Sequence, residues 1–196
     1  ITGDVTDEWD NCATGIEAYV FDDDFTNLID CDNAGYVIRT WRLDDGNGNV
    51  VDKQQIIWVE PTPRIFPVPA STIQCDSTTT NIQLESPSTF TSGLITFKYT
   101  AVSSGAPGDL TGFVASDNNL PLDYIIADNL INHTDQPQTV TYTITPVSPT
   151  GCNDGPSQVV TVTVNPTPRI FPIPTGSSIQ CDSTTTNIQL ESPSTF

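Results

Sequence analysis

Thr139–Thr145 reads TVTYTIT and Gln158–Val164 reads QVVTVTV, and these two stretches decide the fold. Apolar and polar residues alternate in both. One face of the pair then carries the apolar side chains Val140, Tyr142, Ile144, Val160, Val162 and Val164. This period of two, with threonine on the opposite face, is typical of antiparallel strands that have one buried and one solvated side. We therefore expect the closing hairpin of a β-sandwich.

Further strands are expected on both sides of this hairpin, because β-branched and aromatic residues gather in short runs between turn residues. No segment has a convincing helical period. Residues 103–123 read as a long excursion rich in glycine, proline and asparagine. The expected strands are Ile16–Phe21, Tyr36–Leu43, Gln54–Val59, Thr80–Leu84, Leu94–Val102 and Tyr124–Ile126.

A second signal is a repeat. Residues 61–90 read PTPRIFPVPASTIQCDSTTTNIQLESPSTF, and residues 166–196 read PTPRIFPIPTGSSIQCDSTTTNIQLESPSTF. From Ile73 and from Ile179 onward the two copies are identical. A period of this length suits one sandwich domain per repeat. We expect a window from a longer tandem array: residues 1–60 as a domain truncated at its start, 61–165 as a complete repeat, and 166–196 as the start of the next.

Proline-rich joints separate these domains. Prolines at 61, 63, 67 and 69 recur at equivalent positions from 166 onward. Proline fixes φ and removes a backbone donor, so such a linker is expected to be extended and semi-rigid.

The chain is strongly acidic, with 24 acidic and 6 basic residues and a net charge of −18. This charge repels nucleic acids and anionic membranes, and favours divalent cations as counter-ions. No apolar run is long enough to span a bilayer. We expect neither nucleic-acid binding nor direct membrane insertion.

The chain has five cysteines, and each unit supplies one early and one late. The last unit, residues 166–196, contains only its early cysteine, Cys181. This pattern suggests the disulfides Cys12–Cys31 and Cys75–Cys152, with the partner of Cys181 lying beyond the chain end. The alternative is that they are reduced, buried thiols. Disulfides would place the protein in an oxidising exterior.

The ending YTITPVSPTGCNDGPSQVVTVTVNPTP, together with the earlier IQC, resembles the PKD-like domains found in tandem in giant surface adhesins of the Bacteroidetes. Residues 11–59 resemble the HYR-like domain, although Gly46 stands where that family often has a cysteine. The resemblance implies an all-β fold of tandem immunoglobulin-like sandwiches joined by proline-rich linkers. It also implies a stalk on the surface of a Gram-negative cell, associated with the outer membrane, exported by type IX secretion and used for attachment and gliding. Its partners would be neighbouring repeats and, through a distal tip, a surface polysaccharide or other substratum.

The alternative function is a spacer or carbohydrate-binding module of a secreted polysaccharide-degrading enzyme. Three tryptophans, Trp9, Trp41 and Trp58, raise this possibility, although core packing is the more ordinary role for them. Catalysis by this chain is not expected. His133 is its single histidine, in a loop, and no nucleophile elbow or metalloprotease motif is present.

Calcium is the best small-ligand hypothesis. Asp44, Asp45, Asn47 and Asn49 place oxygen ligands in a glycine-containing loop, as Ca²⁺ prefers. The alternative is ordinary hairpin-turn chemistry with solvated charge. Further ligands would come from two acidic groups: Asp22, Asp23 and Asp24 in a predicted acidic loop, and Asp4, Asp7 and Asp10.

Glycosylation is a second hypothesis. Ser77 and Ser183 follow an aspartate and precede a threonine, which resembles the O-glycosylation signal of Bacteroidetes. A plain serine and threonine turn is the alternative. Asn132 begins an N-glycosylation sequon, which would carry no weight if the source is bacterial, as the resemblance implies.

Overall fold

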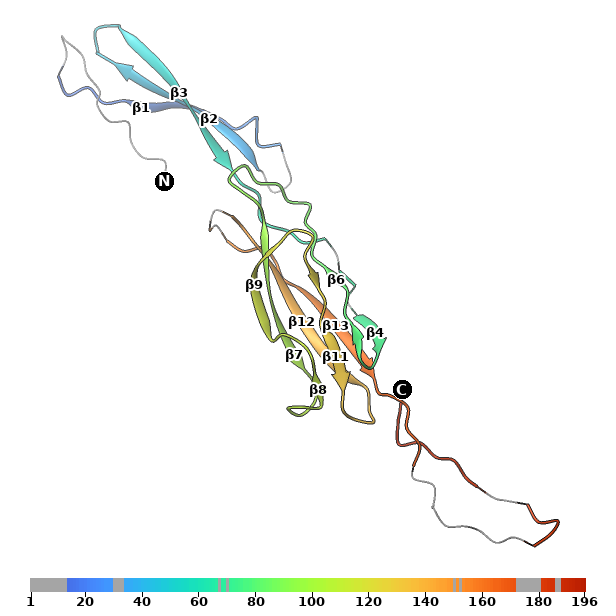
Figure 1. Ribbon diagram of the computed structural model, residues 1–196. Helices are drawn as coiled ribbons and strands as arrows, with labels where there is room; N and C mark the ends of the chain where they lie inside the picture. Colours follow the sequence, from blue (N-terminus) through green and yellow to red (C-terminus); the bar gives the residue numbers. More distant parts are fainter. Residues whose placement is uncertain are drawn as a thin grey trace. The chain divides into compact units, whose positions relative to one another are not determined.

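The computed structural model describes residues 14–29, 34–66, 68–69, 71–149, 151, 153–171, 181–185 and 188–196. It divides into two compact units, residues 1–62 and 63–196 (Figure 1). The described residues form strands and irregular connections without a helix, and so contain no helix able to cross a membrane. The all-β prediction is confirmed.

Unit 1 contains an antiparallel sheet in the order β1-β2-β3. Its strands are β1 (Tyr19–Asp24), β2 (Gly35–Asp44) and β3 (Val50–Val59). The β2–β3 hairpin keeps one register from Gly35 opposite Val59 to Asp44 opposite Val50. This confirms the two strands that the β-branched and aromatic runs predicted, and the Asp/Asn/Gly segment is the loop that joins them.

The predicted acidic loop at Asp22, Asp23 and Asp24 is wrong, because all three residues belong to β1. The strand is shifted toward the C-terminus relative to the expected Ile16–Phe21. Arg39 on the neighbouring β2 donates two hydrogen bonds of 2.8 Å to the Asp23 carboxylate. A cross-strand ion pair therefore compensates an acidic residue in the sheet. These bonds, opposed by partial desolvation, hold the pKa of Asp23 below its ordinary value.

Unit 2 is built on a five-stranded sheet in the order β4-β13-β12-β7-β9. β12 and β13 form the predicted closing hairpin, with Val140 opposite Val162. All neighbours are antiparallel except β4, which runs parallel to β13. The strands are β4 (Ser71–Cys75), β7 (Thr96–Ser103), β9 (Ser116–Pro121), β12 (Gln138–Val147) and β13 (Gln158–Asn165).

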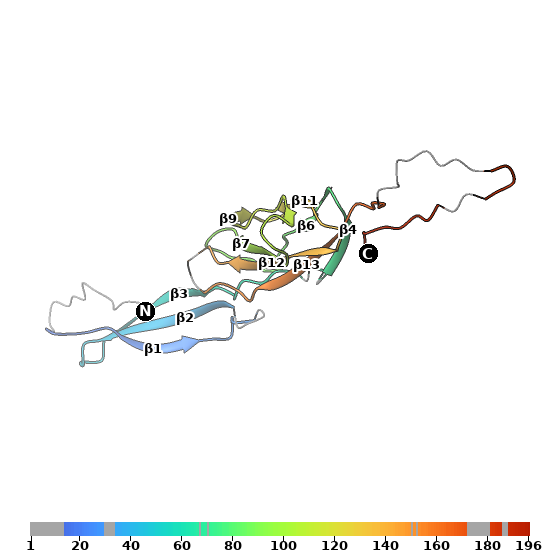
Figure 2. The same ribbon diagram turned by 90° about the horizontal axis from the view of Figure 1, so that it is seen from below.

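Short strands make the second layer, in the orders β5-β11-β8 and β10-β6. Figure 2 shows β6 and β11 of this layer on one side of β12 and β13. They are β5 (Thr78–Thr79), β6 (Ile82–Gln83), β8 (Leu110–Thr111), β10 (Ile125–Ile126) and β11 (Asn129–Asn132). The two layers give unit 2 the immunoglobulin-like sandwich that the sequence predicted.

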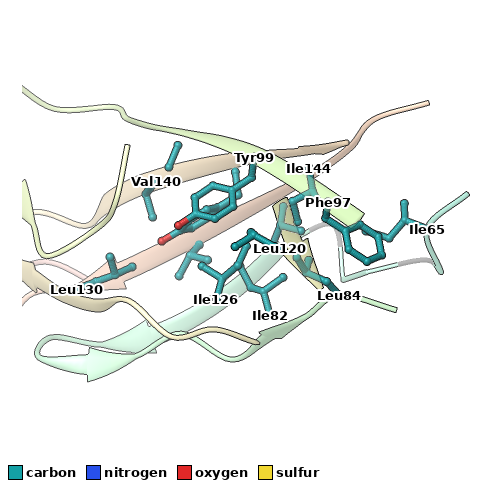
Figure 3. Close-up of a cluster of buried hydrophobic side chains, with 14 of the residues drawn as sticks. Ile65, Ile82, Leu84, Phe97, Tyr99, Leu120, Ile126, Leu130, Val140 and Ile144 are labelled. Atoms are coloured by element: carbon teal, nitrogen blue, oxygen red, sulfur yellow. The ribbon is translucent and has the colours of Figure 1, made fainter. Parts of the chain in front are cut away.

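The core lies between these layers (Figure 3). The six apolar residues of the closing hairpin are all buried, with exposures of 0–1%. Phe97 and Tyr99 of β7 join them from the same sheet, and Leu84, Ile126 and Leu130 close the core from the other side. The alternation rule therefore identified the buried face correctly.

Equivalent apolar residues of the two sequence copies differ in solvent exposure. Ile82 and Leu84 of the first copy are 6% and 0% exposed, whereas their equivalents Ile188 and Leu190 are both 65% exposed. The segments around them are identical in sequence. The difference arises because β7, β12 and β13, which cover the first pair, belong to residues that only the first copy has within this chain.

Two buried tyrosines make the stability of the core depend on pH at the alkaline end. Burial, then the nearby charge of Asp128, raises the pKa of Tyr99 to about 12, and burial with a hydrogen bond to Asp128 raises that of Tyr142. Because unfolded tyrosines ionise near pH 10, their contribution to stability is complete below about pH 10 and falls as the pH rises toward 12. Denaturant melts between pH 8 and 12 are expected to show this loss. A stability unchanged up to pH 12 would contradict it.

Candidate functional site

The hairpin loop at residues 44–49, the predicted calcium site, is organised by its own carboxylates. Asp45 accepts hydrogen bonds from the amides of Asn47 and Asn49, at 2.8 and 3.0 Å, and from the Asn49 side chain at 2.6 Å. Asp44 accepts from the Gly46 amide. Bonds from Asn49 and Asn47 lower the pKa of Asp45. These hydrogen bonds are those of an ordinary hairpin turn, which was the alternative to a calcium site.

Calcium binding there stays a prediction, because an ion would have to replace those loop bonds. Among the described residues, no three His, Cys, Asp or Glu side chains gather closely enough to hold a metal ion. Asp4, Asp7 and Asp10 lie outside the described residues. A rise in melting temperature with millimolar calcium would support the hypothesis.

Cys75 is a free, exposed thiol at the end of β4, opposite Asn165 at the end of β13. Cys152 lies outside the described residues. The expected Cys75–Cys152 bridge therefore stays a prediction.

Alkylation of the folded chain with and without reductant tests the predicted bridge. If Cys75 is bridged, it is expected to resist labelling until reductant is added, although it is exposed. Peptide mass mapping would show the label, and Cys181, also exposed, serves as the internal comparison. Labelling of Cys75 without reductant would exclude the bridge. Cys12 and Cys31 lie outside the described residues.

The serines of the glycosylation hypothesis occupy the same turn in both copies. Ser77 and Ser183 are exposed, with positive φ of 58° and 65°. In each turn the next threonine donates to the cysteine carbonyl at 2.7 Å. The turn predicted as the alternative is therefore present, and the glycan stays a prediction. Asn132 is buried and donates its side-chain amide to the Gln136 and Val164 carbonyls, so it is inaccessible to N-glycosylation.

His133 follows β11 and is exposed. Its Nε2 atom lies 2.8 Å from the Thr111 hydroxyl. The ring thus joins two neighbouring strands of the second layer, β11 and β8, at their surface.

A sequence match runs from within β4 to just beyond β13. Residues 72–168 match the PKD-like domain family. A solved structure of protocadherin gamma B2 extracellular cadherin domains 3–6 is similar at 14% identity, with a TM-score of 0.35. That match covers 70% of this chain, which spans 35% of the protocadherin structure. No curated protein matches the chain.

The PKD-like domain holds a buried polar network that the sequence did not reveal. Asp128, 8% exposed, accepts hydrogen bonds from the Tyr142 hydroxyl at 2.7 Å and the Val114 amide at 3.2 Å. The Thr80 hydroxyl donates to the Ile126 carbonyl and lies 2.8 Å from the Asp128 amide. Through Asp128 and Tyr142, hydrogen bonds connect the second layer to β12. An aspartate between short apolar runs gives no pattern that would have identified it.

The tryptophans are not core residues as far as the structure describes them. Trp58 is 56% exposed and its ring lies 5.2 Å from that of Tyr36, on the paired strand. Trp41 is half-buried and donates to the Gln55 side chain. The expectation of core packing is therefore wrong for Trp58. Trp9 lies outside the described residues.

Proposed function

We propose that this chain is a structural stalk segment of a long secreted cell-surface adhesin, of the kind that Bacteroidetes use for attachment and gliding. Its work is to give reach and stiffness to a binding tip. The chemistry of the described surfaces supports a mechanical role: carboxylates are used in turns and cross-strand pairs, and half-buried threonines line the solvated face of the closing hairpin.

One observation carries this proposal: the chain enters and leaves the PKD-like domain at opposite ends. A side chain at Gly155, three residues before β13, would collide with the Pro63 carbonyl, so the entry lies beside the start of β13. The chain leaves after Asn165, at the other end of this strand. Each copy therefore extends the chain by roughly 25 Å or more. A module of this kind suits head-to-tail repetition.

Antibodies raised against residues 61–165 test the proposal in the native host. They are expected to label intact cells, and protease treatment of those cells should remove the label. Deleting the repeats should reduce attachment to a substratum without affecting growth. Label confined to the cell interior would exclude the stalk role.

A carbohydrate-binding role is the second candidate, and the exposed Trp58, beside the half-buried Tyr36, favours it. Aromatic rings open to solvent are the usual platforms for sugars, because they combine apolar faces with polar edges. A glycan array distinguishes the two functions: binding that is lost with Trp58→Ala would support a carbohydrate-binding module. The half-buried Trp41 provides the comparison, through Trp41→Phe.

A further inference from the structure

The opening of the second copy lies against the end of the PKD-like domain from which the chain leaves. The Thr167 hydroxyl donates to Asp76 at 2.6 Å, and the Arg169 guanidinium lies 3.4 Å from Asp135. Thr195 donates its amide to the Asp135 carbonyl at 3.0 Å and its hydroxyl to Gln136 at 2.6 Å. Two separate parts of the second copy, residues 167–169 and 195, thus contact the same end of the sandwich.

The second copy makes these contacts with its own local structure in place. The Phe171 amide donates to the Glu191 carbonyl at 2.8 Å, as Phe66 does to Glu85 at 2.9 Å in the first copy. The Arg169 amide donates to the Ser194 hydroxyl at 3.0 Å, and Arg64 makes the equivalent bond to Ser88 at 2.9 Å. The segment that meets the sandwich is therefore already arranged as the opening of a repeat.

The accepting side is also built into the domain. The other oxygen of Asp76 accepts the Asn132 amide at 2.7 Å, and Asn132 is anchored by its bond to the Val164 carbonyl. Although partial burial opposes it, the bonds from Thr167 and Asn132 lower the pKa of Asp76, so this carboxylate is charged at neutral pH. Its orientation is fixed from within the sandwich before the second copy contacts it.

We propose that Asp76, Asp135 and Gln136 form a docking surface for the opening of the following repeat, so that consecutive copies are held by a fixed polar joint. The inference rests on the proposed function and deepens it: stiffness of the stalk comes from this joint as well as from the proline-rich linker. The chemistry it recognises is two threonine hydroxyls and one guanidinium, presented at the spacing of this repeat.

NMR on the isotope-labelled chain tests the joint. Residual dipolar couplings of residues 167–171 and 191–195 are expected to fit the alignment tensor of β12 and β13. Amide exchange at Thr195 should be slowed. In the variant Thr167→Val/Arg169→Gln/Thr195→Val, exchange of the backbone amide at position 195 is expected to accelerate about tenfold, and the couplings of both segments are expected to average toward zero. The Phe171 amide, bonded within the second copy, reports whether local structure survives.

Thr185→Val is the matched control, because Thr185 is exposed in the same copy. It should leave couplings and exchange unchanged. Two outcomes would contradict the proposed joint. The first is averaged couplings for residues 167–171 in the unsubstituted chain while β12 and β13 remain ordered. The second is a triple variant whose couplings and exchange rates equal those of the unsubstituted chain. These outcomes leave antibody labelling of intact cells unaffected, so failure of the joint is distinguishable from failure of the stalk role.

Discussion

Replacing Phe97 by alanine is expected to lower the free energy of unfolding of the PKD-like domain by about 3–5 kcal/mol. Phe97 is fully buried on β7 and belongs to the cluster shown in Figure 3, where it lies beside Ile65. Its loss removes apolar burial and leaves a cavity that the surrounding strands cannot close. Since a domain of this size is stable by about 5–15 kcal/mol, much of the total would be lost. Urea titration followed by tyrosine fluorescence measures the change.

Val102→Ala is the matched control for this prediction. Val102 lies on the same strand but is 67% exposed, so its replacement is expected to change stability by less than about 0.5 kcal/mol. Equal effects at the two positions would mean that β7 does not face the core as described.

The second large effect is expected at Asp128. Asp128→Ala removes the acceptor of the Tyr142 hydroxyl and the Val114 amide, leaving a buried hydroxyl without this partner. Hydrogen bonds to charged groups contribute about 1.5–3 kcal/mol each, and an unsatisfied buried donor adds its desolvation cost. We expect a loss of about 3 kcal/mol in the same urea titration.

Two comparisons isolate this effect. Tyr142→Phe removes only the hydroxyl and should cost about 1–2 kcal/mol, and the double variant should cost less than the sum of the two single changes. Asp117→Ala, at a partly exposed position on β9, should be within about 0.5 kcal/mol of the unsubstituted chain. Additive costs for Asp128 and Tyr142 would contradict a shared bond.

The sequence predicted elements whose side chains alternate. β7, β12 and β13 were expected because one buried face imposes a period of two, and β2 and β3 because β-branched and aromatic residues gather in runs. β9 was missed because it reads SDNNLP and has one buried apolar residue, Leu120. Its strand conformation comes from pairing with β7, with Thr96 opposite Pro121. β4 was missed for a similar reason: it is an edge strand with an exposed Ile73, and β13 supplies its hydrogen bonds.

Site residues were harder to predict, because side-chain contacts depend on which strand ends come together. The predicted Cys75–Cys152 bridge depends on the position of Cys152, which is outside the part of the chain that the structure describes. Asp76 was singled out only as part of a glycosylation signal. Its bond to Thr167 spans 91 residues, and no local pattern contains that information.

Identical residues at Ile82/Leu84 and Ile188/Leu190 have opposite solvent exposure, and this affects how the protein should be divided for experiments. A recombinant fragment that ends within a repeat exposes apolar side chains to solvent, and these side chains favour self-association during purification. The C-terminal boundary of an expressed fragment is better placed after a complete closing hairpin, such as directly after Asn165, than at the end of the repeated sequence.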